Sequence, residues 1–254
     1  METGIQISSL KPLLTTAQQV EAALARLARM GVDTVQLQWI DPAVSIPEID
    51  EALMGSGIAS VSVQDFSTAI LQDPVYYLDL NAVTGGTWLC LSRVPERTRA
   101  GLERYAQALE VLRDRAAELD QKLCFHPVAA DLVPIDGICP VDFLMERLKW
   151  LDLCWDLYHV HKAGLSIPDT LRRYPHRVCM VHFKDFKVLP DGTELKTIMD
   201  YANEIGDADL HKKAIEVFDM AFNAGWDKEF GGILYFMDCL GNPPEAYEHD
   251  MKLW

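Results

Sequence analysis

The sequence predicts an α/β protein folded as a single (β/α)8 TIM barrel over residues 1–254. Three observations predict this fold. Eight short apolar runs of strand length recur along the chain, amphipathic stretches of helical spacing separate most of them, and eight such units match one barrel in size. The first run is not followed by a GxGxxG turn, which disfavours an open dinucleotide-binding sheet.

The expected strands are mostly continuous in their apolar residues, which is typical of parallel strands covered on both faces. They lie at residues 4–8, 34–39, 59–63, 87–92, 122–127, 151–156, 177–183 and 231–238. Residues 240–254 are expected to form a short C-terminal cap on the same domain.

Helical spacing is clearest at residues 95–121, which begin with Pro95 at a first-turn position. The apolar stripe of this helix consists of Leu102, Tyr105, Leu109 and Leu112. Residues 15–31 show the same periodicity between a threonine cap and a closing glycine. A weaker helix at residues 67–82 is interrupted by Pro74.

Charge and composition limit the partners of the protein. Lysine and arginine number 23 against 38 aspartate and glutamate residues, so the formal net charge is −15. A field of this sign repels the phosphates of nucleic acids and of anionic lipids, so neither is expected as a partner. No apolar stretch approaches the ~20 residues of a membrane span, and residues 1–14 lack the features of a signal peptide. These features predict a cytoplasmic protein, and a homo-oligomer is compatible with them.

The six cysteines follow no CxxC spacing, and several lie inside apolar runs. They are Cys90, Cys124, Cys139, Cys154, Cys179 and Cys239. We expect buried, reduced thiols rather than disulfides or zinc ligands.

Polar side chains gather where the expected strands end, which is the edge that carries the active site in TIM barrels. The polar residues expected at this edge are Gln6, Gln36, Gln38, Gln64, Asp65, Ser92, Arg93, His126, Asp156, His159, His182, Lys184, Asp185 and Asp238. Aromatic residues flank the same edge, where one or two of them could form an apolar wall for a sugar ring. These aromatic residues are Trp39, Phe66, Trp155, Phe183 and Phe186.

A metal site is expected among these polar residues. His126, Asp156 and His182 stand at corresponding ends of three successive expected strands, and such ends converge at one barrel mouth. Imidazole together with carboxylate suits Mn, Fe, Co or Zn better than Ca. The residues therefore predict one divalent metal, with a metal-free network of His and Asp side chains as the alternative. His161 and Lys162 are expected on a solvated helix start.

Several stretches resemble a known family in the same order along the chain. "GIQISSLKPL" resembles its first strand, and "ALARLARMGVDTVQLQ" its first helix and second strand. "WDLYHVHKAG" resembles its Asp-x-x-His…Gly segment after strand six, and "RVCMVHFKDF" its His-x-Lys-Asp strand seven. "NEIGDADLHKKAIEVFDMAFNAGW" resembles the loop and helix before strand eight. The family is that of the xylose-isomerase-like TIM barrels, which includes sugar phosphate isomerases and epimerases, hydroxypyruvate isomerase, inosose dehydratase and, more distantly, endonuclease IV.

The resemblance implies one divalent metal held by an acid on strand five, Asp on six, His on seven and Glu on eight. Asp156 and His182 match strands six and seven. His126, followed by proline, stands where the family commonly has Glu, and Asp238 is the acid nearest to the expected Glu of strand eight. A Glu is also frequent in the family where Gln36 stands.

The activity implied is that of a metal-dependent isomerase or epimerase, which abstracts a proton next to the carbonyl of a sugar or sugar-like polyol ketone. His126, Lys184 and Asp238 are the expected catalytic residues, with His126 as the base if it is not a ligand. The residues expected to bind substrate are Gln36, Asp65, His159 and Lys184. Two alternatives stay open. One is a lyase on the same scaffold, such as an inosose-type dehydratase or the barrel subunit of a C-glycoside-cleaving enzyme. The other is a non-catalytic binding or partner barrel.

Overall fold

The computed structural model describes residues 4–184 and, beyond them, only residues 187–188, 194–195, 212, 233–234 and 252–253. The chain divides into two compact units, Met1–Lys184 and Asp185–Trp254. In the second unit β8 (Lys187–Val188) pairs antiparallel with β9 (Glu194–Leu195), and β10 (Ile233–Leu234) with β11 (Lys252–Leu253). Among the described residues, no helix is both long and apolar enough to cross a bilayer.

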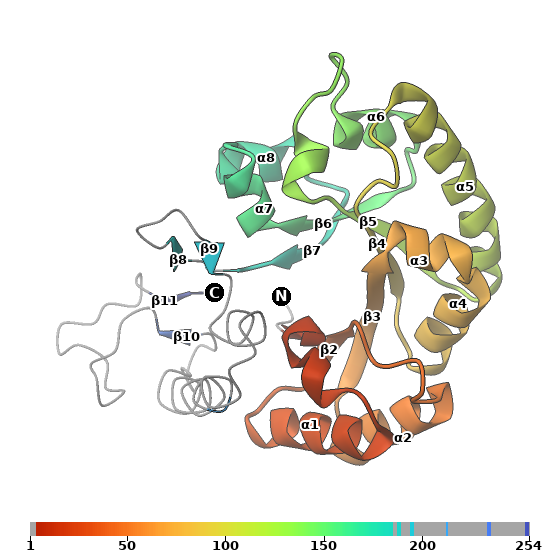
Figure 1. Cartoon of the computed structure of the whole chain (residues 1–254), viewed down its shortest axis with the longest axis vertical. Helices are drawn as coiled ribbons and strands as arrows, with labels where there is room; N and C mark the ends of the chain where they lie inside the picture. The colour runs from red at the N-terminus through yellow and green to blue at the C-terminus, as the bar shows by residue number, and fades with distance from the viewer. Residues whose placement is uncertain are drawn as a thin grey trace. The chain divides into compact units, whose positions relative to one another are not determined.

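The first unit is built on a seven-stranded parallel sheet whose strands follow one another in chain order. The strands are β1 (Ile5–Gln6), β2 (Thr34–Leu37), β3 (Ala59–Phe66), β4 (Trp88–Ser92), β5 (Lys122–His126), β6 (Asp152–Asp156) and β7 (Val178–His182). Figure 1 shows the sheet curling into a partial barrel with helices along its outer face. The predicted α/β barrel architecture is thereby confirmed for this unit.

The eighth predicted strand, residues 231–238, is described only at β10, which pairs with β11 and is not among the strands of the parallel sheet. The other residues of this prediction lie outside the described part of the chain. The single domain over residues 1–254 and its C-terminal cap therefore stay predictions.

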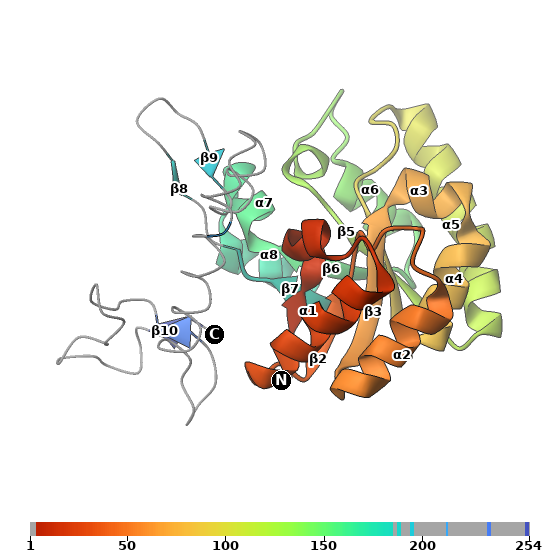
Figure 2. The same cartoon turned by 60° about the horizontal axis from the view of Figure 1, so that its bottom comes forward.

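Helices connect the strands as the alternation predicts. They are α1 (Ala17–Arg29), α2 (Ile46–Ser56), α3 (Ser67–Gln72), α4 (Pro74–Val83), α5 (Arg99–Glu118), α6 (Pro140–Arg147), α7 (Leu157–Lys162) and α8 (Ile167–Arg173), with the 3-10 helices η1 (Ile7–Leu13) and η2 (Ala129–Leu132). The predicted interruption at Pro74 is confirmed, because α4 starts there and the side chain of Asp73 accepts a hydrogen bond from the Tyr76 amide. Figure 2 shows α1 and α2 side by side.

The longest helix, α5, starts later than the sequence predicts. Thr98 caps it by accepting a hydrogen bond from the Gly101 amide at 3.0 Å, so Pro95 precedes the helix instead of standing in its first turn. A threonine hydroxyl can satisfy an orphan amide of the first turn, which proline cannot do. The predicted stripe is confirmed, and its four residues are buried: Leu102, Tyr105, Leu109 and Leu112.

The inner face of the sheet carries two layers of side chains, with a layer of cysteines below the polar residues at the strand ends. Side chains two residues apart on a strand share a face, so Cys124 lies below His126 and Cys154 below Asp156. The thiols of Cys90, Cys124 and Cys154 are fully buried in one cluster. The prediction of buried thiols is confirmed for these three cysteines, whereas Cys139 and Cys179 are only half-buried, and the five cysteines of the described part are free. Cys239 lies outside it.

Candidate metal centre

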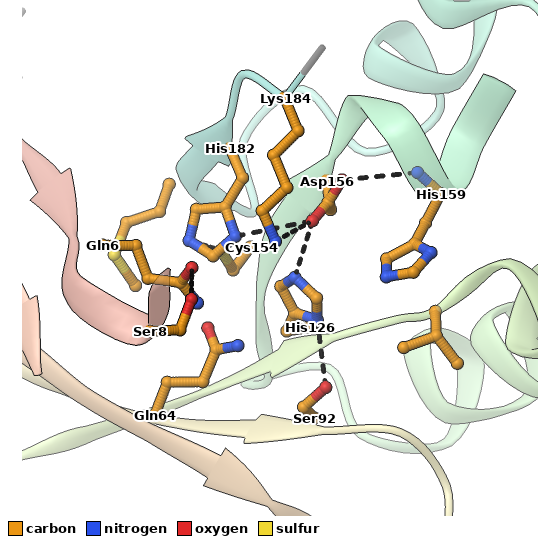
Figure 3. A network of polar contacts seen from close by, with 12 residues as sticks. Gln6, Ser8, Gln64, Ser92, His126, Cys154, Asp156, His159, His182 and Lys184 are labelled. Carbon is orange, nitrogen blue, oxygen red and sulfur yellow. Dashed lines mark hydrogen bonds and ion pairs between the residues drawn. The ribbon is translucent and has the colours of Figure 1, made fainter. Parts of the chain in front are cut away.

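Three side chains converge at the C-terminal ends of three adjacent strands. His126 ends β5, Asp156 ends β6 and His182 ends β7, and Asp156 is in register with His182. One possible ligand atom from each of the three lies within 4.8 Å of the others. Figure 3 shows the two imidazoles facing the carboxylate between them. The structure thus brings together the three residues expected to form the metal site.

Asp156 is the centre of this cluster. Its side chain is completely buried, and its Oδ2 lies 3.3 Å from His126 Nε2 and 3.8 Å from His182 Nδ1. Burial alone would raise the pKa of this carboxyl, but the neighbouring imidazoles of His126 and His182 and the ammonium of Lys184 outweigh burial and hold the pKa well below its usual range. Asp156 therefore carries a buried negative charge.

Each histidine is oriented by a polar neighbour on the ring nitrogen that lies away from Asp156. His126 Nδ1 lies 3.1 Å from Ser92 Oγ, and His182 Nε2 lies 2.8 Å from Gln36 Oε1. Metal-ligating histidines show this arrangement, in which the far nitrogen is held by a polar neighbour and the near nitrogen points to the ion. Burial lowers the pKa of His182, which favours the neutral imidazole that a metal needs.

Gln36 determines which nitrogen of His182 carries the proton. The Gln36 amide nitrogen donates to Ser62 Oγ at 2.6 Å, so its oxygen is left to accept from His182 Nε2. A neutral His182 then presents the lone pair of Nδ1 toward the carboxylate of Asp156, and within the described part of the chain this Nδ1 has no hydrogen-bond partner. The Nδ1 lone pair of His182 and the carboxylate of Asp156 face each other, and a cation between them would stabilise both. The donor set and its geometry therefore fit a divalent metal held by His126, Asp156 and His182.

Lys184 adds a positive charge beside this carboxylate. Its ammonium lies 2.8 Å from Asp156 Oδ2, and its side chain is 36% exposed. The structure thus places the Lys184 ammonium against the carboxylate of Asp156. Asp185 lies outside the described residues, as does Asp238, the predicted strand-eight ligand and catalytic acid.

Helix α7 continues directly from the site. Asp156 caps this helix, because its Oδ1 accepts a hydrogen bond from the His159 amide at 3.3 Å. The ring of His159 stands edge-on to that of His126, with centroids 5.8 Å apart. His161 is exposed as expected, but it lies in the last turn of α7 and not at a helix start. The close pairing of Asp156 and His159 is thus a consequence of helix capping.

The other predicted edge residues do not all turn toward the metal cluster. Asp65 accepts hydrogen bonds from Tyr77 Oη at 2.7 Å and from Trp39 Nε1 at 3.3 Å. These residues and Lys11 line a cavity of about 360 Å³ beside the ends of β2 and β3. Burial, followed by the hydrogen bond to Asp65, raises the pKa of Tyr77, which keeps the phenol a donor. A substrate role for Asp65 stays a prediction.

Sequence reasoning missed two residues that touch these sites. Cys154 Sγ lies 3.4 Å from His182 Nε2, and strand alternation could have placed it, because it stands two residues before Asp156. Tyr77 carried no such signal, because it lies on a helix that the sequence defines weakly. Among the aromatic residues of this edge, Trp155 belongs to the buried core, while Phe66 and Phe183 are exposed. Phe186 lies outside the described residues.

Comparison with known proteins gives a short sequence match and long structural ones. No family model matches the chain. N-acylglucosamine 2-epimerase from Bos taurus is 43% identical over 58 residues, which are 22% of this chain and 14% of that protein. The Mus musculus enzyme is 41% identical over the same length. The chain thus spans about 14% of the length of the curated relatives it matches.

Solved structures align over most of the chain. A sugar phosphate isomerase/epimerase from Parabacteroides distasonis has a TM-score of 0.62 at 14% identity, covering 80% of this chain and 82% of the other. D-psicose 3-epimerase from Clostridium cellulolyticum gives 0.57 at 16% identity, with 82% of each chain covered. A 3-keto-D-glucoside 4-epimerase from E. coli gives 0.55 at 16%, covering 85% and 88%. The chain therefore has the fold of the xylose-isomerase-like TIM barrels, as its motifs implied.

Proposed function

We propose that this protein is a metal-dependent isomerase or epimerase, which moves a proton on the carbon next to the carbonyl of a sugar or sugar-like polyol ketone. The observation that carries the proposal is the convergence of His126, Asp156 and His182 at the mouth of the barrel. The solved structures of similar fold include proteins described as sugar epimerases, which supports this class of reaction.

The two imidazoles and the carboxylate would hold one divalent ion. Neutral imidazole with one carboxylate suits Mn, Fe, Co or Zn, and it leaves coordination positions for substrate oxygens. Such an ion supplies Lewis-acid polarisation of the substrate carbonyl, which makes the neighbouring C–H more acidic. Ser92 and Gln36 keep the two histidines oriented for this role.

The remaining polar groups at the mouth would handle the charge and proton of the reaction. The ammonium of Lys184 is partly exposed and can neutralise the oxygen that becomes negative when the proton leaves. The His159 ring, beside His126, can contact the substrate. When His126 serves as a ligand it is no longer free to be the base, and Asp238 remains the candidate for that task on the predicted eighth strand.

Exchange of substrate protons with solvent tests the proposal. The purified protein, loaded with Mn²⁺ or Co²⁺, is incubated in ²H₂O with a panel of ketoses and keto-inositols, and deuterium at the carbon next to the carbonyl is measured by NMR. We expect exchange with at least one compound, its loss in Asp156→Asn, and no change in the exposed variant Lys149→Met. Loss of water from a keto-inositol would instead identify a lyase on the same scaffold. Metal-loaded protein that exchanges none of the panel contradicts the proposal.

A further inference from the structure

The carboxylate at the centre of the candidate metal site already has a cation beside it. Lys184 Nζ lies 2.8 Å from Asp156 Oδ2, the same oxygen that faces His126 Nε2 at 3.3 Å and His182 Nδ1 at 3.8 Å. Figure 3 shows the lysine side chain entering the cluster from the end of β7, with its ammonium beside the carboxylate. One oxygen is therefore surrounded by three nitrogens, of which only the ammonium carries a permanent charge.

Burial explains why the lysine is held there. Asp156 is fully buried and ionised, and an isolated buried carboxylate is costly unless a positive charge or hydrogen bonds compensate it. Lys184 contributes that charge while its side chain stays 36% exposed. The lysine stem is flexible and partly in solvent, so its ammonium has room to leave the carboxylate.

A divalent ion and the Lys184 ammonium would both bind to Asp156 Oδ2. A metal held by Asp156 Oδ2 and the two imidazole nitrogens would bind the same oxygen that accepts the hydrogen bond of the ammonium at 2.8 Å. The two cations would repel each other strongly in a buried setting. Neither can use Asp156 Oδ2 fully while the other is present.

We propose that Lys184 is the resident counter-ion of Asp156 and competes with a divalent metal for its carboxylate. Metal loading releases the ammonium to the barrel mouth, where it can neutralise a negative oxygen of the substrate. The lysine thereby links the filling of the metal site to the appearance of a free cation beside it. This inference rests on the proposed function only in requiring that the site binds metal.

Metal affinity tests the competition without an activity assay. Co²⁺ is titrated into the parent protein and into Lys184→Met and Lys184→Gln, with calorimetry for affinity and visible absorption for coordination. Both variants remove the charge, and we expect each to bind Co²⁺ on the order of tenfold more tightly, or better. Lys149→Met removes the same charge at an exposed position and is expected to keep the parent affinity. Thermal unfolding by circular dichroism checks that each variant is folded.

The outcomes separate the two proposals. Tighter binding in the folded Lys184 variants, with Lys149→Met unchanged, supports the competition. Equal or weaker binding in these variants, while the parent protein binds Co²⁺, overturns the role of Lys184 and leaves the proposed function standing. If neither the parent nor any variant binds Co²⁺, both the competition and the metal-dependent reaction are refuted.

Discussion

A buried carboxyl in the segment after β5 allows a quantitative test of how burial changes the pKa of an acidic side chain in this fold. Asp131 lies on η2, the 3-10 helix that follows β5, and its side chain is completely buried. Oδ2 accepts a hydrogen bond from the Val128 amide at 3.0 Å, while Oδ1 has no hydrogen-bond partner in the described part of the chain. Burial raises the pKa of Asp131 from 3.8 to about 6, although the Val128 and Val94 amides, Arg97 and Arg93 oppose this effect.

The raised pKa of Asp131 determines whether the free energy of unfolding rises or falls with pH. Between pH 3.8 and about 6 the folded state binds the Asp131 proton more tightly than the unfolded state does. The stabilisation from this proton is complete below pH 3.8 and is lost as the pH rises through about 6. At 1.36 kcal/mol per pH unit, this difference in pKa corresponds to roughly 3 kcal/mol in the free energy of unfolding.

Asp131→Asn removes this titration and keeps an oxygen that can accept from the Val128 amide. The free energy of unfolding of the variant, relative to the parent, should therefore rise by roughly 2.4 kcal/mol from pH 4 to pH 7.5, since part of the full difference is already lost at pH 4. Urea denaturation followed by circular dichroism at several pH values measures it, with the exposed Asp114→Asn as the matched control. A difference between variant and parent that stays constant across this range would refute the reasoning.

Three further predictions follow from the site and the core. Gln36→Leu removes the acceptor that orients His182, so Co²⁺ affinity measured by calorimetry should fall about 10- to 100-fold. Gln36→Glu keeps an acceptor and should lose much less affinity. Equal loss in both variants would argue against the orienting role. Asp156→Asn removes the central charge but can still cap α7. The visible absorption of bound Co²⁺ should therefore not develop, while the circular dichroism spectrum stays native. A Co²⁺ spectrum identical to that of the parent would exclude Asp156 as a ligand. Leu109→Ala creates a cavity under α5 and should lower the free energy of unfolding, measured in urea, by about 2–5 kcal/mol. The exposed control Val111→Ala should lower it by less than about 0.5 kcal/mol. Similar losses in both variants would contradict the assigned core.

Much of the fold and part of the site follow from local sequence. Apolar runs of strand length predicted all seven strands of the sheet, and the break at Pro74 predicted the boundary between α3 and α4. Because parallel strands end at one edge, the polar residues after each run could be placed together before any contact was known. That rule brought His126, Asp156 and His182 into one group, and the structure places them within reach of a single ion.

The partners of these side chains were decided by the tertiary structure. Gln36 and His182 are 146 residues apart in sequence, and they meet because the curled sheet brings the ends of β2 and β7 across its inner face. Lys184 pairs with Asp156 because β6 and β7 are neighbours in register and the buried carboxylate attracts the nearest flexible cation. Periodicity in a sequence encodes which face of a strand is buried, but hydrogen bonds and ion pairs depend on the distances between strands. The sequence therefore predicted His126, Asp156 and His182, whereas their protonation and their partners depend on the packing of the sheet.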